Sequence, residues 1–360
     1  MGLPNANGDL STEVEVDAFR RLFPLHFYEK HLLESISPDA RPLGRARETT
    51  IALGAVASAN GSALAKIGST TMLAAIKMKV MTPSLETPDE GCIVIDFHMP
   101  PICSPIVRPG GPAEAAPVVA KQLSDTILRH ANLVPWLFID AEMHPIKPVN
   151  LLVVVTCDVL KQLVMCNYSS GMINLKELSL VSGKAAWMAY LDIYCLDADG
   201  ALFDTALLSA VAAFSHCKFC FGVSNLTVFI LRKKIPVEIP VVSLNDDGKI
   251  VLSEEQGLSD REPVNKEKRK INLSSVPFSL TCVLHKNYIL ADPTAEEESI
   301  MDTILTVVLD SSSQLVSLHK PGGTVLAYTS AIQDCIALTR QRVKELQKIL
   351  EEAISGMEVD

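Results

Sequence analysis

The chain has 360 residues, of which 48% are hydrophobic and 21% are charged, and its formal net charge is −10. This length allows one large domain or two of ordinary size, with ample apolar content for a core. The negative charge excludes nucleic-acid binding by bulk attraction, so an RNA partner would require a local basic patch or basic partner subunits.

The cysteines and the N-terminal sequence indicate a reducing, intracellular compartment. Nine cysteines are scattered without a repeating spacing, and the acidic N-terminus lacks the charged-then-apolar order of a signal peptide. Cys217 and Cys220 form a lone CxxC without a second ligand pair, so free thiols are favoured over a metal or redox site. The most apolar run, Val149 to Cys157, is too short to cross a bilayer. We therefore expect no membrane partner, no metal and no cofactor.

An amphipathic helix, or two short ones broken near Pro24, is predicted over 14–35, followed by a turn at 41–45 (RPLGR) with a basic residue at each end. Strand patterns then follow, and Asn60-Gly61 is typical of a hairpin turn. The strands expected in this part are Thr49–Ala57, Ser62–Lys66, Met72–Val80 and Cys92–Phe97. A helix is expected over 113–128, with Pro117 near its first turn.

The stretch from Trp187 to Phe214 predicts a strand, a tight acidic turn and a helix. The strand covers 189–196, the turn is Asp197-Ala198-Asp199-Gly200, and Asp204 is the expected N-cap of the helix. Many folds hold a phosphate at such a corner. Asp197 and Asp199 could serve acid–base or metal chemistry, but spacing alone favours a turn in which Asp makes local backbone hydrogen bonds.

The C-terminal part repeats the order of strands and then a helix. Expected strands are Ile239–Leu244, Lys249–Leu252, Ser279–Leu284, Tyr288–Ala291, Ile304–Leu309 and Gln314–His319, and a long helix covers 329–354. Asp292 and Glu296–Glu298 could serve acid–base or metal chemistry, but a turn entering a helix with acids in its first turn is favoured. The charged segment 253–270 is expected to be a solvated loop rather than an RNA-binding or nuclear-import patch.

Two strand-rich halves that each end in a helix predict an α+β domain. A dinucleotide-binding βαβ fold is disfavoured, since the chain has no GxGxxG fingerprint, and a serine hydrolase is disfavoured because GxSxG is absent. The eight histidines are dispersed and suggest no catalytic pair.

Six motifs, in order along the chain, together resemble the RNase PH-like core subunits of the eukaryotic RNA exosome. They are 41–45 (RPLGR), 61–71 (GSALAKIGSTT), the loop from Pro100-Pro101 to Pro112, 196–200 (LDADG), 290–297 (LADPTAEE) and 318–323 (LHKPGG). The Asp-Gly turn and the Asp-Pro-Thr-x-Glu-Glu sequence are similar to the branch of this family that does not carry out phosphorolysis.

The resemblance implies an RNase PH-like fold of two similar β/α halves (ribosomal protein S5 domain 2-like), with N-terminal and C-terminal helices. It also implies a place in a hexameric ring of RNase PH-like subunits, with RNA-binding cap subunits and RNA as further partners. RNA would pass through the ring for 3′-to-5′ processing and degradation, in rRNA maturation and mRNA turnover. The implied locations are the nucleus, the nucleolus and the cytoplasm.

Active relatives place Gly-Thr/Ser-Arg directly after the Asp-Gly turn to hold phosphate, whereas this chain has Ala201, Leu202 and Phe203 after Asp199 and Gly200. Phe offers no anion donor. We therefore expect a structural corner with Phe203 or Leu202 packed, no catalytic residue, and no phosphorolysis by this chain alone. The alternative is an active phosphorolytic exoribonuclease with a site shared with a neighbouring subunit; an unrelated small-molecule activity has no supporting motif.

For RNA contact, the resemblance points to Arg108 in the Pro-rich loop, with Arg45 and Lys66 as weaker candidates. An ordinary surface charge is the alternative for each of them.

The expected organisation is an N-terminal helical extension (1–40), a first half and core (41–240) and a second half (241–360). Two stretches, about 129–168 and 217–238, are extra relative to the family: they are either surface insertions or products of retained introns or an incorrect gene model.

Overall fold

The computed structural model describes residues 15–104, 113–128, 171–217, 273, 275–301, 303–321 and 329–356, together with the backbone of 242–244 and 250–252. The first extra stretch lies outside these residues, as does the second apart from Cys217. Arg108, Cys220 and the segment 253–270 also lie outside them.

The first sheet has six strands in the order β1-β2-β3-β6-β4, with β5 paired to β6. The strands are β1 (Thr49–Leu53), β2 (Gly61–Ile67), β3 (Thr70–Met81), β4 (Cys92–His98), β5 (Ser179–Val181) and β6 (Ala185–Asp197). All neighbours are antiparallel except β4 and β6, which run parallel. A short 3-10 helix, η3 (Leu175–Leu178), precedes β5.

The second sheet is antiparallel throughout, with strand order β10-β9-β11-β12. Its strands are β9 (Pro277–His285), β10 (Tyr288–Ala291), β11 (Thr303–Asp310) and β12 (Leu315–His319). Every residue of β9 is buried, as expected of an inner strand covered on both faces. A separate pair, β7 (Val242–Leu244) and β8 (Ile250–Leu252), forms a small two-stranded sheet.

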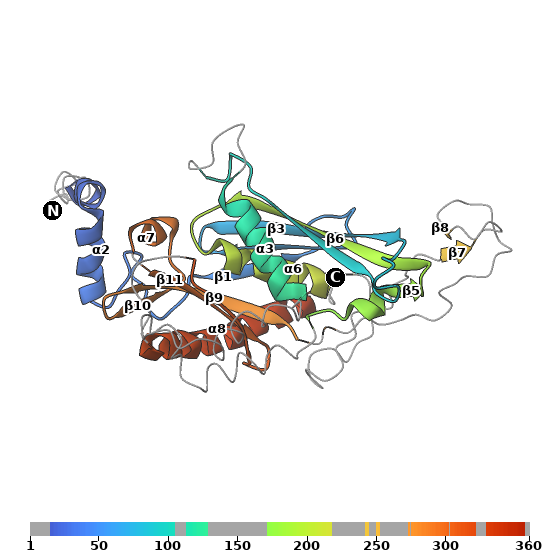
Figure 1. The fold of residues 1–360 in the computed structure, drawn as a ribbon. Coiled ribbons are helices and arrows are strands. Elements are labelled where there is room, and N and C mark those ends of the chain that lie inside the picture. The colour runs from blue at the N-terminus through green and yellow to red at the C-terminus, as the bar shows by residue number, and fades with distance from the viewer. Residues whose placement is uncertain are drawn as a thin grey trace, which may run out of the picture.

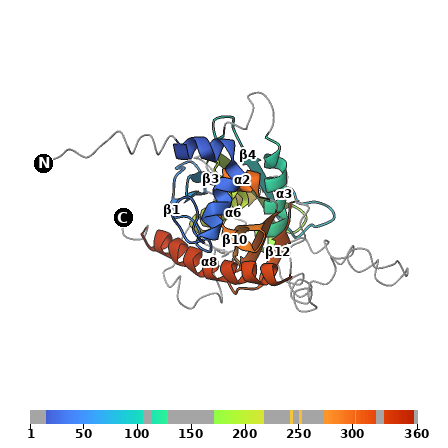
Figure 2. The same cartoon turned by 90° about the vertical axis from the view of Figure 1, so that its left-hand side faces the viewer.

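Helix α6 (Leu202–His216) lies between the two sheets, contacting β2 and β3 on one side and β9 on the other (Figures 1 and 2). Every residue from Phe203 to Phe214 is buried. A helix that is buried all round must be covered on opposite faces, and the two sheets provide this cover. Helix α3 (Ala115–Leu128) lies beside α6 and packs on β4 through Val119, Leu123 and Ile127.

The C-terminal helix α8 (Thr329–Gly356) runs below the second sheet and reaches β1 of the first (Figure 1). At the other end, residues 15–22 are helical and α2 (Pro24–Leu33) follows, so the predicted break near Pro24 is confirmed. These N-terminal helices meet α7 (Ala295–Ile300), where Arg20 pairs with Glu296.

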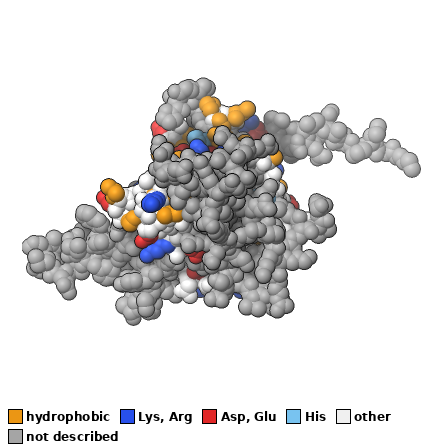
Figure 3. All heavy atoms as spheres, turned by 90° about the vertical axis from the view of Figure 1, so that its right-hand side faces the viewer, with side chains coloured by type: hydrophobic (Ala, Val, Ile, Leu, Met, Phe, Trp, Pro, Cys, Tyr) orange, Lys and Arg blue, Asp and Glu red, His pale blue; other side chains and the backbone are white. Residues whose placement is uncertain are grey.

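The first sheet presents its inner face to the helices and its outer face to solvent. On β3, Met72, Ala74 and Ile76 are fully buried, whereas Lys77 is exposed on the other face. The predicted alternation of this strand is therefore confirmed. At the end of the molecule that carries β5, hydrophobic, basic and acidic side chains are interspersed on the described surface (Figure 3).

The α+β class is confirmed, and the predicted strands and helices within the described residues are present with shifted ends. The strand expected over 49–57 stops at Leu53, and the strand expected from Ala189 already begins at Ala185. Among the described helices, none combines the length and the apolar content needed to cross a membrane.

Candidate functional site at the junction of the two sheets

The corner between β6 and α6 begins with two consecutive residues in left-handed backbone conformation. Gly200 has φ 74° and Ala201, the N-cap of α6, has φ 47°. Ala201 makes no side-chain cap, and the helix starts at Leu202. The prediction that Asp204 caps the helix is therefore wrong, because this residue already lies in the first turn.

The Asp204 side chain turns toward the second sheet and joins it to the helix. Its carboxylate accepts a hydrogen bond from the Thr281 amide of β9 at 2.6 Å. Burial raises the pKa of Asp204 to about 6, and the hydrogen bond from the Thr281 amide opposes the rise. A residue expected to satisfy its own helix therefore links two layers of the fold.

Gly200 lies directly against the second half of the chain. A Cβ atom on this residue would be 2.3 Å from the carbonyl oxygen of Pro293. The Thr70 hydroxyl donates to the Gly200 carbonyl at 2.8 Å and accepts from the Asp199 amide at 3.0 Å. The requirement for glycine here has two causes, positive φ and close backbone approach.

A carboxylate from the second half occupies the start of α6. The Ala201 amide donates to Oε1 of Glu298 at 2.8 Å. Burial raises the pKa of Glu298 to about 7, against the opposing effect of the Ala201 hydrogen bond. A free helix N-terminus attracts anions through its unpaired amides. Here one of those amides is already bound to an acidic side chain.

The residues that follow the turn are packed, as predicted. Phe203 is 5% exposed and lies edge-on to the His319 ring, with a centroid separation of 5.7 Å. Leu202 packs against the core from a partly buried position. Burial lowers the pKa of His319, which favours its neutral form. The Ala-Leu-Phe sequence thus places packed apolar side chains directly after the Asp-Gly turn.

Arg47 connects the corner to the loop after β10. Its Nε and Nη2 atoms donate to the two carboxylate oxygens of Asp292 at 3.0 and 2.8 Å, and the Arg47 amide donates to the same group. Nη1 donates to the Asp199 carbonyl at 2.7 Å. Burial alone would lower the pKa of Arg47, but Asp292 and Asp199 hold this pKa above its ordinary value. The buried guanidinium is therefore engaged by two carboxylates and by the backbone carbonyl oxygens of Asp199 and Pro293.

The acidic group at 292–298 forms the predicted turn and helix start. Thr294 and Glu297 make a capping box at the start of α7, each side chain bonding the other residue's backbone amide. Buried Glu297 also accepts from Ser37, and Arg41 donates to the carbonyl oxygens of Ala291 and Asp292. These contacts are structural, which confirms the favoured interpretation of this segment.

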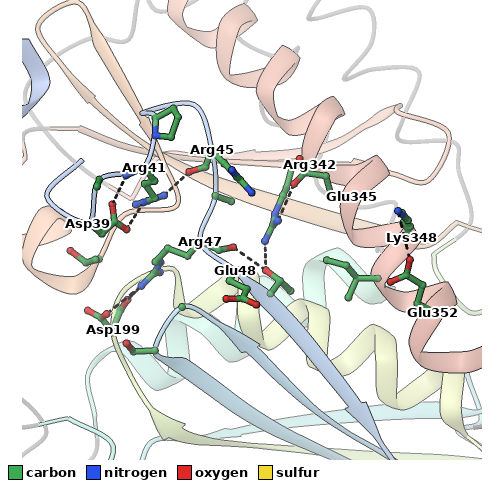
Figure 4. A pocket seen from close by; sticks show the side chains of 18 residues that line it. Asp39, Arg41, Arg45, Arg47, Glu48, Asp199, Arg342, Glu345, Lys348 and Glu352 are labelled. Atoms are coloured by element: carbon green, nitrogen blue, oxygen red, sulfur yellow. Dashed lines mark hydrogen bonds and ion pairs between the residues drawn. The ribbon is translucent and has the colours of Figure 1, made fainter. Parts of the chain in front are cut away.

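A cavity of about 950 Å³ opens beside the corner, between the 39–49 segment and α8 (Figure 4). Its basic residues are mostly paired with acids of the same wall. The pairs are Arg41–Asp39, Arg47–Asp199, Arg342–Glu345 and Lys348–Glu352. Arg45 and Glu48 add one further charge of each sign. The cavity wall is therefore balanced in charge, which does not favour a polyanion such as RNA.

The structure places two of the three predicted RNA-contact residues, and it does not bring them together in one patch. Arg45 is exposed and points into the cavity (Figure 4). Lys66 is exposed on β2, on the outer face of the first sheet. Arg108 lies outside the described residues.

Sequence reasoning missed Arg47 and the bond between Glu298 and Ala201. Arg47 is only two residues beyond the RPLGR motif, yet its partners are separated from it by 152 and 245 positions. The nearest signal in the sequence was the pair of acidic turns at 197–200 and 292–298. The two acidic turns come from different halves of the chain, which suggests that one basic residue binds both of them. Sequence spacing does not identify that residue.

The fold and this junction define an RNase PH-type protein, and comparison with known proteins agrees. The "3' exoribonuclease family, domain 1" model matches residues 45–219, and the domain 2 model matches residues 275–342. The first match contains the Asp-Gly corner and the second contains the 292–298 segment. The chain therefore belongs to the 3′ exoribonuclease family.

Within this family, curated relatives include exosome components. The chain is 26% identical over 324 residues to exosome complex component rrp43 of Schizosaccharomyces pombe, covering 90% of this chain and 94% of that protein. It is 26% identical over 311 residues to exosome complex component Rrp42 of Methanopyrus kandleri, covering 86% and 89%.

The solved structures support the fold. A chain of the Archaeoglobus fulgidus exosome with RNA bound to the active site matches with a TM-score of 0.60 at 22% identity, covering 93% of this chain and 98% of that chain. An archaeal exosome core matches with a TM-score of 0.55 at 20% identity, covering 94% and 99%.

Proposed function

We propose that this chain is a non-catalytic subunit of an RNA exosome ring, where it supports 3′-to-5′ RNA processing and degradation. Its curated relatives are exosome components over most of their own length. The residues that would contribute chemistry at the junction are instead engaged in holding the two halves together.

One observation carries the non-catalytic part of the proposal. The Glu298 carboxylate bonds the first amide after the Asp-Gly turn, and Phe203 is buried where an anion donor would be required. Arg47, the buried cation at this corner, is bound by Asp292 and Asp199. A phosphate entering this corner would meet carboxylates and an apolar ring rather than free donors.

We propose other RNase PH-like subunits as direct ring partners, together with RNA-binding cap subunits and RNA in the central path. The formal net charge of −10 means that RNA is better held by the assembly than by this chain's bulk charge. We also propose the nucleus, the nucleolus and the cytoplasm as its locations.

Co-expression with RNase PH-like ring subunits from the same organism tests this assignment. The chain should co-elute with them as a complex of ring size, in equal stoichiometry, and omission of the chain should leave the ring open or incomplete. Closed rings of the same size without the chain would overturn the assignment, as would failure to associate with any such subunit.

Arg108 is our first candidate for RNA contact, and Arg45 and Lys66 are weaker ones. Arg108→Glu should reduce RNA crosslinking to the assembled ring without changing its elution. Arg45→Glu should have a smaller effect because its cavity is balanced in charge. Unchanged crosslinking in the Arg108 variant would remove this residue from the RNA path.

A further inference from the structure

Three potential metal ligands meet on the outer face of the first sheet, away from the junction. Strands β4 and β6 run parallel, and their register places Asp96 directly beside Asp192. His98 follows Asp96 by two positions on β4. Because side chains alternate along a strand, Asp96 and His98 point to the same face of the sheet.

The ligand atoms of these residues lie close enough to share one ion. One carboxylate oxygen each from Asp96 and Asp192 and one ring nitrogen of His98 all lie within 4.8 Å of one another. Asp96 and His98 are exposed and Asp192 is half-buried, so solvent reaches the group. The His98 ring also stacks on Tyr194, with centroids 4.7 Å apart and an interplanar angle of 23°. This stacking restricts where the imidazole can point.

The neighbouring carboxylates of Asp96 and Asp192 favour the binding of a cation. Like charges placed directly opposite on neighbouring strands destabilise a sheet. In the part of the chain that the structure describes, neither Asp96 nor Asp192 takes part in an ion pair with Lys or Arg. Across β6 from Asp96, the partner of Asp192 on β3 is Ala75, which carries no charge. Lys79 instead lies over the Tyr190 ring, 4.9 Å from its centroid.

We propose that Asp96, His98 and Asp192 form a binding site for a single divalent transition-metal ion, with Zn²⁺ as the preferred class. One imidazole and two carboxylates are a ligand set that Zn²⁺ accepts, with a fourth position left for water. Mg²⁺ and Ca²⁺ prefer oxygen ligands alone, so the imidazole disfavours them. The site goes beyond the proposed ring function and does not depend on it.

The site exists only in the folded chain, because Asp192 joins the other two residues through the β4–β6 pairing. An ion bound there should raise the stability of the native state. It should also fix the register of these two strands. Loss of a supporting residue around a metal typically weakens binding about 10–100-fold, and removal of a direct ligand should cost at least as much.

Isothermal titration of the purified full-length chain with Zn²⁺, compared with His98→Gln and Asp192→Asn, tests the proposal. The wild type should show one site that each variant weakens by about 100-fold, together with a Zn²⁺-dependent rise in Tm that the variants lose. The exposed residues His26 and Asp89 supply matched controls, and His26→Gln and Asp89→Asn should bind like the wild type.

The absorption spectrum of bound Co²⁺ distinguishes this site from a site with cysteine ligands. Co²⁺ bound to oxygen and nitrogen ligands lacks the intense thiolate charge-transfer band, so the His98-dependent spectrum should contain no such band. The far-UV circular dichroism of all variants should match that of the wild type, since the changes are at the surface. Equal Zn²⁺ affinity in the wild type and His98→Gln would overturn the proposal, and so would the absence of binding or a His98-dependent thiolate band.

Discussion

Acidic side chains gather in two regions of this molecule, and their surroundings differ. At the junction, Asp199, Asp292 and Glu298 are bound by Arg47 or by backbone amides that come from the other half of the chain. On the outer face of the first sheet, Asp96 and Asp192 lie side by side next to the His98 imidazole, and among the described residues neither carboxylate takes part in an ion pair with Lys or Arg. The first region is closed by its own partners, and the second is open to an external one.

The comparison shows that residue type does not decide function. Both regions contain the acids that a binding or catalytic site uses, but a buried acid that already has its hydrogen bonds is committed to the fold. An exposed acid beside a like charge retains binding capacity. Partners and burial therefore separate the structural corner from the candidate ligand site.

The largest expected effect comes from breaking the junction at Arg47. Arg47→Ala would leave Asp292, which is 2% exposed, without its cation. Loss of one partner of a buried ion pair typically costs about 3–5 kcal/mol in the free energy of unfolding. Urea denaturation measures this loss, and Lys121→Ala serves as the control because its helical pair is exposed and worth only about 0.3–0.5 kcal/mol. If Arg47→Ala lowered the free energy of unfolding by as little as the control does, Arg47 would not hold the two halves of the chain together.

Gly200 tests how tightly the two halves meet. Gly200 and Gly183 both have positive φ, but a Cβ on Gly183 would meet nothing within 4 Å. Gly183→Ala should therefore cost only the conformational strain, about 1–2 kcal/mol. Gly200→Ala should cost a further 1–3 kcal/mol, roughly, because the added methyl group would overlap the Pro293 backbone. Equal losses in thermal denaturation would contradict the close packing of the corner.

The pH dependence of stability should change when Glu298 is replaced. Its folded pKa of about 7 is above its ordinary value of 4.5, so the stability that this group contributes is present below pH 4.5 and is lost as pH rises through 7. Glu298→Gln keeps an oxygen for the Ala201 amide and removes the half-buried charge. At pH 8 the variant should be more stable than the wild type, by up to roughly 3 kcal/mol.

At pH 4.5 this advantage should largely disappear. Asp204, whose pKa is about 6, is present in both proteins, and its charge adds to the rise in the pKa of Glu298. Exposed Glu86 offers the control, and Glu86→Gln should leave the pH profile unchanged. Equal stability of Glu298→Gln and the wild type at every pH would mean that the corner does not disfavour the charged form of Glu298.

The smallest effect is expected on the outer face. Asp192→Asn removes one member of the like-charged pair and should raise stability by about 0.2–1 kcal/mol when no metal is added. Urea denaturation in the presence of a chelator measures this gain. A destabilisation of several kcal/mol would show that Asp192 has a structural partner, which would make the two regions alike.

Much of the fold was predictable because local patterns determine it. Alternation along β3 and the helical spacing of the α8 sequence indicate which residues face the core, and both patterns hold in the structure. The burial of Phe203 was also predictable from its residue type. The role of Asp204 was predicted incorrectly, because an acid at the start of a helix is typical of an N-cap while its actual partner, Thr281, belongs to the distant β9.

The parts that could not be predicted depend on long-range pairing. Arg47 meets Asp292 only because both sheets fold around α6, and no local period in the sequence encodes that contact. Asp96 and His98 have strand spacing, but Asp192 joins them through a parallel register set by the crossover between β4 and β6. The predicted domain boundaries and the role of Arg108 stay predictions.

The central claim is that the corner between β6 and α6 holds the two halves together and performs no phosphorolysis. Incubation of the purified chain with 5′-labelled single-stranded RNA and inorganic phosphate tests it most directly, with shortening of the labelled RNA and chromatographic detection of nucleoside diphosphate as the readouts and an active RNase PH as the positive control. We expect no phosphate-dependent shortening and no nucleoside diphosphate. Robust phosphate-dependent shortening of the RNA by the wild type would contradict the claim.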